Sequence, residues 1–452
     1  MLFCLEGATL VNQLERVRKN KGHPVSRRRW LGIVASTTTA CLLPRSVPME
    51  TPIAIDSPWP GIAVYRRGQV SIYGRSSLDL AVQSLIRSRQ IRVANGGDGL
   101  WSLNIPRSSQ SPSSDANGST NAVAASTNVV ITPFLAGMNY PAWTKDVLQS
   151  HQSDQSLSDL RAAGANAVTL VLPVYQDTFR SVTVTRDPST TPSDSSIRHA
   201  VTQAHALDMH VILKPLLILR DTGVSTPNGP SWRGVVTPSS WSRWFDSYGQ
   251  MLEHYASLGS ALGTFGLVIG TEMKSATPHS DSWRGLIARC QKLYSGSLFY
   301  CANWDEYDQV KFWDALPMLG IDAYPPLTQH SDPSEKELYQ GWQNWLPQIW
   351  KWQSSWQKPL MIGEVGYQSA AFSTVEPWVQ SQQAPADLEL QRRAYSAAIS
   401  AFRTWPQLAG LFWWNWETDP TAGGDSDNGF TPQNKPAMDV LRAWFKDEGT
   451  GP

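Results

Sequence analysis

The sequence predicts an α/β protein whose main part is a (β/α)8 barrel, with a small accessory segment before it. After residue 128, eight short apolar runs alternate with eight amphipathic stretches over about 320 residues, as strands and helices do in such a barrel. Gly137-Met138-Asn139-Tyr140, at the end of the first run, lacks the glycine spacing of a phosphate-binding turn. The barrel is therefore favoured over its alternative, an open doubly wound sheet.

The predicted strands are short runs rich in Val, Ile, Leu and Phe, as expected for strands that are buried on both faces. They cover residues 130–140, 167–174, 210–217, 264–272, 298–303, 319–324, 360–364 and 408–414. The predicted helices repeat apolar residues about every three or four positions. They cover residues 154–163, 195–208, 239–259, 281–294, 307–314, 335–356, 387–404 and 435–446.

The segment before the barrel divides into three parts. Residues 46–106 form a small accessory α/β element, with a predicted hairpin of strands at 62–65 and 70–73, and are too few to hold a large core alone. Residues 107–128 are dominated by Ser, Asn, Ala and Thr and are predicted to be a flexible linker. The barrel then occupies residues 129–447.

Residues 1–45 are predicted to be an export signal or a lipid-anchor segment. Arg27, Arg28 and Arg29 precede a mildly apolar stretch at 31–43, an order that resembles a twin-arginine signal. Thr39-Ala40-Cys41 loosely resembles a lipoprotein cleavage site, so a membrane anchor at Cys41 is open, as is an ordinary N-terminus with a chance run of arginines. We expect an extracellular or cell-surface protein.

Composition excludes some partners and leaves others open. The net charge is zero, so nothing attracts the chain to nucleic acid. The 21 Trp residues suit a packed core and also a cleft that stacks on sugar rings. Cys290 and Cys301, the cysteines of the barrel, have no metal-binding spacing and are expected to be buried free thiols or one disulfide.

Two carboxylates stand at matching places in the predicted barrel. Glu272 follows Gly270-Thr271 at the end of the fourth strand, and Glu364 follows Gly363 at the end of the seventh. The C-terminal ends of barrel strands carry the active site, and a buried Glu needs a partner or a task. Glycoside hydrolysis uses two such acids, one protonating the leaving oxygen while the other attacks the sugar or activates water. The alternative is a pair of structural ion pairs with inward Lys or Arg.

The barrel resembles glycoside hydrolase family 113, a family of retaining (β/α)8 glycosidases. The resemblance covers about residues 130–446 and none of the N-terminal third. The matching pieces are Gly137-Met138-Asn139-Tyr140, Leu213-Lys214-Pro215, Trp232-Arg233-Gly234, Trp244-Phe245-x-Ser247-Tyr248, Gly270-Thr271-Glu272, Trp283-Arg284-x-Leu286-Ile287, Ala302-Asn303-Trp304, Phe312-Trp313-Asp314, Gly320-Ile321-Asp322-Ala323-Tyr324, Gly363-Glu364-Val365-Gly366-Tyr367, Trp414-Asn415-Trp416 and Lys435-Pro436-Ala437.

The resemblance implies a function and roles for the residues. Glu272 would be the acid/base and Glu364 the nucleophile, acting on β-1,4-mannan or manno-oligosaccharides by double displacement. Tyr324 would hydrogen-bond the nucleophile, and Trp414 would be the platform beneath the reacting sugar. This mechanism needs no metal and no organic cofactor. We expect a monomer whose partner is a polysaccharide or oligosaccharide.

Further residues of these motifs are candidates for substrate contact, and one departure affects specificity. The candidates are Asn139, Tyr140, Lys214, Asp221, Trp232, Arg233, Asn303, Trp304 and Trp416. The family often has Lys-Pro-His-Val-Asp after the third strand, whereas this chain has Lys214-Pro215-Leu216-Leu217-Ile218, with Asp221 as a nearby substitute. Two other functions therefore stay open: hydrolysis of another β-linked glycan, and a non-catalytic carbohydrate-binding barrel.

Overall fold

The computed structural model describes residues 128–381, 383–405 and 407–448, together with four short strands before them. Those strands are β1 (Ile62–Arg66), β2 (Gln69–Tyr73), β3 (Ala94–Asn95) and β4 (Trp101–Asn104). The predicted export signal at 1–45 and all but the last residue of the predicted linker at 107–128 lie outside the described residues. Within the described part of the chain, no helix is both long and apolar enough to cross a membrane.

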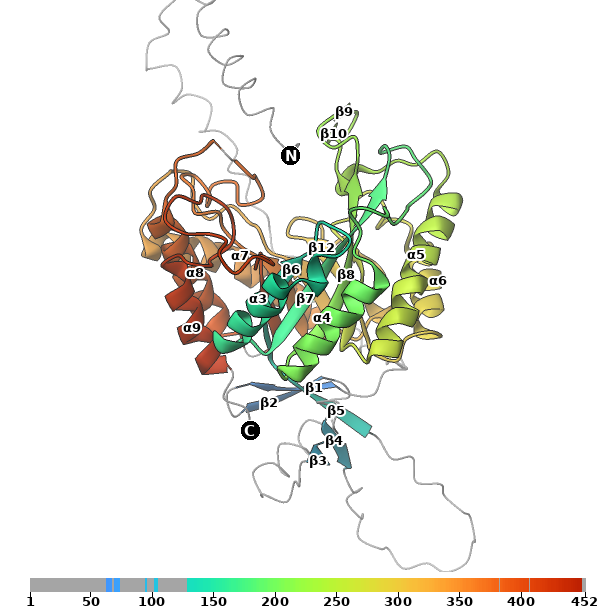
Figure 1. Cartoon of the computed structure of the whole chain (residues 1–452), viewed down its shortest axis with the longest axis horizontal. Helices are drawn as coiled ribbons and strands as arrows, with labels where there is room; N and C mark the ends of the chain where they lie inside the picture. The colour runs from blue at the N-terminus through green and yellow to red at the C-terminus, as the bar shows by residue number, and fades with distance from the viewer. Residues whose placement is uncertain are drawn as a thin grey trace, which may run out of the picture. The chain divides into compact units, whose positions relative to one another are not determined.

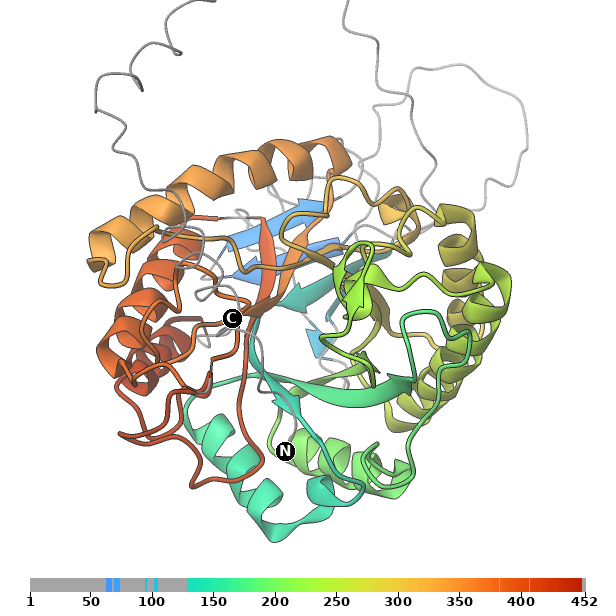
Figure 2. The same ribbon diagram turned by 90° about the horizontal axis from the view of Figure 1, so that it is seen from above.

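Eight parallel strands close into a barrel in the order β11-β12-β13-β14-β15-β6-β7-β8, which confirms the predicted fold class. Figure 2 shows the ring of strands inside the surrounding helices. In chain order the strands are β6 (Leu135–Pro141), β7 (Ala167–Gln176), β8 (His210–Leu219), β11 (Gly266–Thr271), β12 (Ser297–Asn303), β13 (Leu319–Asp322), β14 (Leu360–Val365) and β15 (Leu408–Trp413).

Seven α-helices of the described chain pack around the barrel (Figure 1). They are α3 (His151–Ala162), α4 (Asp194–Ala206), α5 (Trp241–Leu262), α6 (Ser280–Gln291), α7 (Glu335–Trp356), α8 (Leu388–Arg403) and α9 (Ala437–Glu448). Local chemistry sets several of their ends. Ser334 and Glu337 form a capping box at the start of α7, and α5 ends at Gly263, whose φ of 65° suits glycine.

Two predicted elements were wrong. The first strand, expected at 130–140, is divided into β5 (Asn128–Pro133) and β6, and β5 pairs with β1 and β4 instead of joining the barrel. The helix expected at 307–314 is absent, and only the 3-10 turn η3 (Trp313–Ala315) forms there. The Arg284 guanidinium donates to the Lys311 carbonyl and the Lys358 ammonium to that of Trp313, so side chains satisfy backbone groups that a helix would use.

The strands before the barrel form a five-stranded sheet in the order β2-β1-β5-β4-β3. β1 and β2 pair as the predicted hairpin, with Ile62 opposite Tyr73. Arg66, at the end of β1, donates to both carboxylate oxygens of Glu448 in α9, at 2.9 and 2.7 Å. The accessory element therefore makes a buried contact with a barrel helix.

The core has an inner layer within the barrel and an outer layer between strands and helices. The inner layer is filled by side chains such as Leu135, Ile212, Val268, Phe299 and Met361. Alternate residues of a strand point to the same side of the sheet. Counting in steps of two from these core residues therefore predicts which residues face inward nearer the C-terminal end of each strand.

Candidate active site

Glu364 lies within β14 and is 3% exposed. The Lys214 ammonium, from β8, donates to its Oε1, and the Tyr324 hydroxyl donates to its Oε2 at 2.9 Å. The Asn139 amide donates to the carbonyl of the preceding Gly363 at 2.9 Å and so supports the backbone beside it. These two hydrogen bonds, one of them from a charged donor, fix the position of the Glu364 side chain.

Glu272 directly follows β11 and is 7% exposed. The Arg233 guanidinium, from the 3-10 turn η2 (Arg233–Val235), donates to its Oε2 at 2.9 Å. Its backbone N–H donates to the Cys301 carbonyl at 2.8 Å. Glu272 has a φ of 51°, a left-handed conformation that is uncommon for residues other than glycine.

A third carboxyl, Asp322 of β13, lies beside this pair. It is fully buried, and one of its oxygens is 3.6 Å from the Lys214 ammonium. Neither of its oxygens has a hydrogen-bond partner among the described residues. The single positive charge of Lys214 therefore serves two carboxyls, those of Asp322 and Glu364.

Burial and neighbouring charge set the protonation of these groups. Burial raises the pKa of Glu272, and nearby Glu364 raises it further, while Arg233 opposes the rise. Burial raises the pKa of Asp322 well above its usual range, with Lys214 opposing. Burial lowers the pKa of Lys214, but Asp322 and Glu364 outweigh that effect and the net pKa is raised. The site thus holds two stable cations and two acids that are candidates for a proton.

The glycines that precede the two glutamates make room for the residues beside them. A Cβ at Gly363 would lie 2.5 Å from the Cys301 sulfur and 2.7 Å from an Asp322 oxygen. A Cβ at Gly270 would lie 2.8 Å from the rings of both Trp283 and Tyr300. The Gly-then-Glu pattern is therefore a packing requirement of the site.

The structure brings some of the predicted substrate contacts to the two glutamates. Lys214, Arg233 and Tyr324 contact them directly. Asn139 is fully buried and supports the backbone, although its Oδ1 has no partner among the described residues. Asn303 ends β12, and its Oδ1 likewise has no partner among the described residues.

Three other predicted contacts lie elsewhere. Tyr140 is fully buried and its hydroxyl contacts Ser153 of α3. Trp416 is 4% exposed, and its indole N–H donates to Ser156 of the same helix. Asp221 accepts from the Phe179 N–H and the Ser231 hydroxyl, so it joins its own loop to the loop after β7. The side chains of Tyr140 and Trp416 thus point out of the barrel, toward α3, and the structure does not bring them to the two glutamates.

Aromatic side chains are available for sugar stacking at the C-terminal ends of the strands. Trp304, just after β12, stacks on Trp378 with ring centroids 5.7 Å apart, and Trp378 is 47% exposed. Trp414 follows β15 and is partly exposed, as is Trp232 beside Arg233. The pairing of Trp304 with Trp378 was not predicted, because 74 positions, from 304 to 378, separate the two residues.

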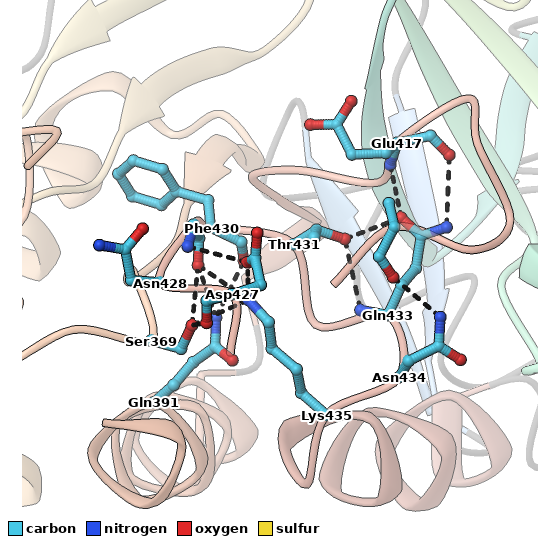
Figure 3. A network of polar contacts seen from close by, with 12 residues as sticks. Ser369, Gln391, Glu417, Asp427, Asn428, Phe430, Thr431, Gln433, Asn434 and Lys435 are labelled. Carbon is cyan, nitrogen blue, oxygen red and sulfur yellow. Dashed lines mark hydrogen bonds and ion pairs between the residues drawn. The ribbon is translucent and has the colours of Figure 1, made fainter. Parts of the chain in front are cut away.

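A polar network joins the loops that follow β14 and β15 (Figure 3). The buried Lys435 ammonium donates to the Ser369 hydroxyl at 2.8 Å, to the Gly429 carbonyl and to the Asp427 carboxylate. The Gln391 amide donates to the carbonyls of Tyr367 and Phe430. The network thereby ties together the loops that follow the strands β14 and β15. Asp427 is thus the ion-pair partner of Lys435.

A closed (β/α)8 barrel with two buried glutamates, a lysine, an arginine and a tyrosine at the C-terminal ends of its strands has the architecture of a barrel glycosidase. Residues 140–435 match the family model of Glycoside Hydrolase Family 113. The chain belongs to this family, as its motifs predicted, and it is a glycoside hydrolase.

Solved structures of this family are similar along the barrel. One is a complex of a GH113 β-1,4-mannanase, with 25% identity and a TM-score of 0.62 over 70% of this chain and 99% of that one. Another is the GH113 β-mannanase AaManA from Alicyclobacillus acidocaldarius in complex with ManMIm, with 27% identity and a TM-score of 0.62 over 70% and 97%. Among curated proteins none matches the chain.

We expect Arg233→Met to move the alkaline limb of the kcat/KM profile to higher pH. Arg233 favours the charged form of Glu272, so its removal raises the pKa of Glu272 further. If activity requires protonated Glu272, it then persists to higher pH. The measurement is kcat/KM against pH, with Arg220→Met as the control, because Arg220 is exposed and pairs with Asp187. A limb that stays in place or moves down contradicts the prediction.

Proposed function

We propose that this enzyme is a retaining β-mannanase that cleaves β-1,4-mannosidic bonds by double displacement. Glu364 is the nucleophile and Glu272 the acid/base. The observation that carries the assignment is the difference between their surroundings, since Glu364 accepts from Lys214 and Tyr324 while burial raises the pKa of Glu272. The mannan specificity rests on the β-1,4-mannanases to which the chain is similar.

The charges of the site suit such a reaction. Lys214 and Arg233 are two cations facing three carboxyls, so one proton among the acids leaves the site neutral, as burial favours. When Glu272 gives its proton to the leaving oxygen, the carboxylate of Glu364 becomes an ester with the sugar. Two positive and two negative charges remain, and Arg233 then stabilises the new charge on Glu272.

The second half of the reaction reverses these changes. Glu272, now charged, takes a proton from water, whose oxygen attacks the anomeric carbon and releases Glu364. Each displacement inverts the anomeric carbon, so the product keeps the β configuration. Tyr324 remains a donor to Glu364 because burial and the nearby carboxyls raise the pKa of its hydroxyl well above the usual range.

A panel of polysaccharides tests the proposal. We expect reducing sugar to be released from mannan and glucomannan, and little or none from xylan or cellulose. NMR of the first product formed should show the β anomer. Activity confined to another β-linked glycan would overturn the mannan assignment alone, and a first product in the α form would overturn the retaining mechanism.

The Leu216-Leu217-Ile218 run keeps hydrolysis of another β-linked glycan as a second candidate. Leu216 and Leu217 are 2% exposed and belong to the packed interior, so they supply none of the polar contacts that His and Asp would supply there. Both oxygens of Asp221 already accept hydrogen bonds, one from the Phe179 N–H in the loop after β7 and one from the Ser231 hydroxyl in its own loop. The same panel separates the two candidates.

We also propose, from the sequence, that the chain is exported by twin-arginine transport. The Arg27-Arg28-Arg29 run and the apolar stretch at 31–43, which is interrupted by Ser and Thr, support this. We expect the double variant Arg27→Lys, Arg28→Lys to remain in the cytoplasm of a host with this pathway, as followed by cell fractionation. Lys19→Arg, which changes another basic residue of the same segment, is the matched control. Continued export of the double variant would contradict the proposal.

A further inference from the structure

Tyr300 links the acid/base segment to a buried glutamate that the sequence analysis did not single out. The Met273 N–H donates to the Tyr300 hydroxyl at 3.1 Å, and that hydroxyl donates to Oε1 of Glu306 at 2.8 Å. All three residues are buried, with exposed fractions of 1% or less. Met273 directly follows Glu272, so this chain of hydrogen bonds ends at the backbone of the acid/base.

Glu306 is itself fixed by the segment that follows β12. Its Oε2 accepts from the Asn303 N–H at 3.3 Å, and its own N–H donates to the Asn303 carbonyl at 2.9 Å. Burial raises the pKa of Glu306 to about 7, against the hydrogen bonds from Tyr300 and Asn303, with Glu272 raising it and Lys274 lowering it. The Glu306 carboxyl is thus close enough to Glu272 to sense its charge.

The backbone at Glu272 needs this support because it is strained. Glu272 has a left-handed φ, which is unfavourable for a residue with a Cβ, and such conformations persist only where neighbours hold them. Both N–H groups at the turn are held from β12, that of Glu272 by the Cys301 carbonyl and that of Met273 by Tyr300. Gly270 lets the Tyr300 ring lie across β11, where a Cβ would collide with it.

We propose that Tyr300 and Glu306 are positioning residues for acid catalysis, which fix the turn at Glu272 and so hold its carboxyl toward the leaving oxygen. The proposal rests on the acid/base role of Glu272. Glu306 orients the Tyr300 hydroxyl so that an oxygen lone pair faces Met273. Without that acceptor the buried Met273 N–H has no partner, and the turn relaxes away from its left-handed conformation.

The test is Tyr300→Phe, assayed on mannohexaose and on dinitrophenyl β-mannobioside. Misplacing the acid should lower kcat on mannohexaose by about 10- to 100-fold. On the dinitrophenyl substrate kcat/KM reports the first step, in which the leaving group needs no proton, and it should fall by less than about threefold. Glu306→Ala should show the same split, and Glu306→Gln should recover most of the activity, because the amide oxygen still accepts from Tyr300.

The matched control is Tyr294→Phe. Tyr294 is 4% exposed and its hydroxyl donates to the Thr264 carbonyl at 2.7 Å, beside the other end of β11. The Tyr294→Phe variant therefore loses a comparable buried hydrogen bond near the opposite end of β11. It should change kcat on either substrate by less than about twofold. Thermal unfolding of each variant shows how much stability was lost. Should Tyr300→Phe fail to fold, the two Glu306 variants decide the question.

Glu272→Gln in the same assays separates the acid/base role of Glu272 from the positioning role of Tyr300 and Glu306. If Glu272→Gln shows the split between substrates and both Tyr300→Phe and Glu306→Ala do not, the positioning role is overturned while the acid/base role stands. If Glu272→Gln lowers kcat/KM equally on both substrates, the acid/base role is wrong and the positioning role falls with it. A split in all three variants, with recovery in Glu306→Gln, supports the inference.

Discussion

Glu364→Ala should abolish turnover of mannan, with a loss in kcat on the order of 10⁵-fold, the scale that follows when a catalytic nucleophile is removed. Glu364 is the carboxylate that Lys214 and Tyr324 both contact, and its replacement leaves nothing to form the bond to the sugar. The measurement is kcat on mannohexaose. Glu253→Ala is the matched control, because Glu253 forms an ion pair with Arg289 outside the barrel.

Azide should then restore part of the activity of Glu364→Ala. The small anion occupies the space of the lost side chain and attacks from the face opposite the leaving group, giving an α-mannosyl azide. The configuration of that product, read by NMR, identifies which face Glu364 served. Near-normal activity without azide, or a β-azide product, would show that Glu364 is not the nucleophile.

The elements that sequence predicted well are those with strong local signals. Helix α7 was predicted with its observed bounds, because Ser334 and Glu337 cap its start and its apolar face repeats at helical spacing. The absent helix at 307–314 had apolar spacing too. Its backbone carbonyls are instead taken by Lys358 and Arg284, which come from other parts of the chain and cannot be inferred from local sequence.

The two candidate catalytic acids could be found in the sequence because each stands at the end of a strand after a glycine. Strand parity would also have corrected Tyr140. Leu135 faces the inside of the barrel, so Asn139, four residues later on the same strand, faces inward, and Tyr140 faces α3. A motif that resembles a family's motif does not place every residue in the site.

The charge arrangement could not be predicted, because five separate parts of the fold build it. Lys214 comes from β8, Arg233 from η2, Glu272 from the end of β11, Asp322 from β13 and Glu364 from β14. Sequence suggested only, as an alternative to catalysis, that the two glutamates pair with inward Lys or Arg. Closing the barrel places Lys214 beside both Asp322 and Glu364. Glu306 was missed for the same reason, since its role depends on the ring of Tyr300 reaching Met273 across β11.

Glu272→Gln should separate substrates by their leaving groups. A general acid contributes about 10²- to 10⁴-fold, so kcat on mannohexaose should fall by that amount. The dinitrophenolate of dinitrophenyl β-mannobioside departs without a proton, so the first step of hydrolysis should be nearly unchanged on this substrate. Because the amide of this variant has no acidic proton to lose, the alkaline limb that arises from the raised pKa of Glu272 should also disappear for the remaining activity.

Azide should also identify the role of Glu272. In Glu272→Gln the ester with Glu364 still forms, and azide attacks it in place of activated water, so the product is a β-mannosyl azide. Glu364→Ala instead gives the α anomer, so the two products together assign both acids. Glu253→Gln is the control and should leave both substrates unaffected. Equal losses of kcat/KM on the two substrates, with the alkaline limb retained, would mean that Glu272 acts through structure and that another group supplies the proton.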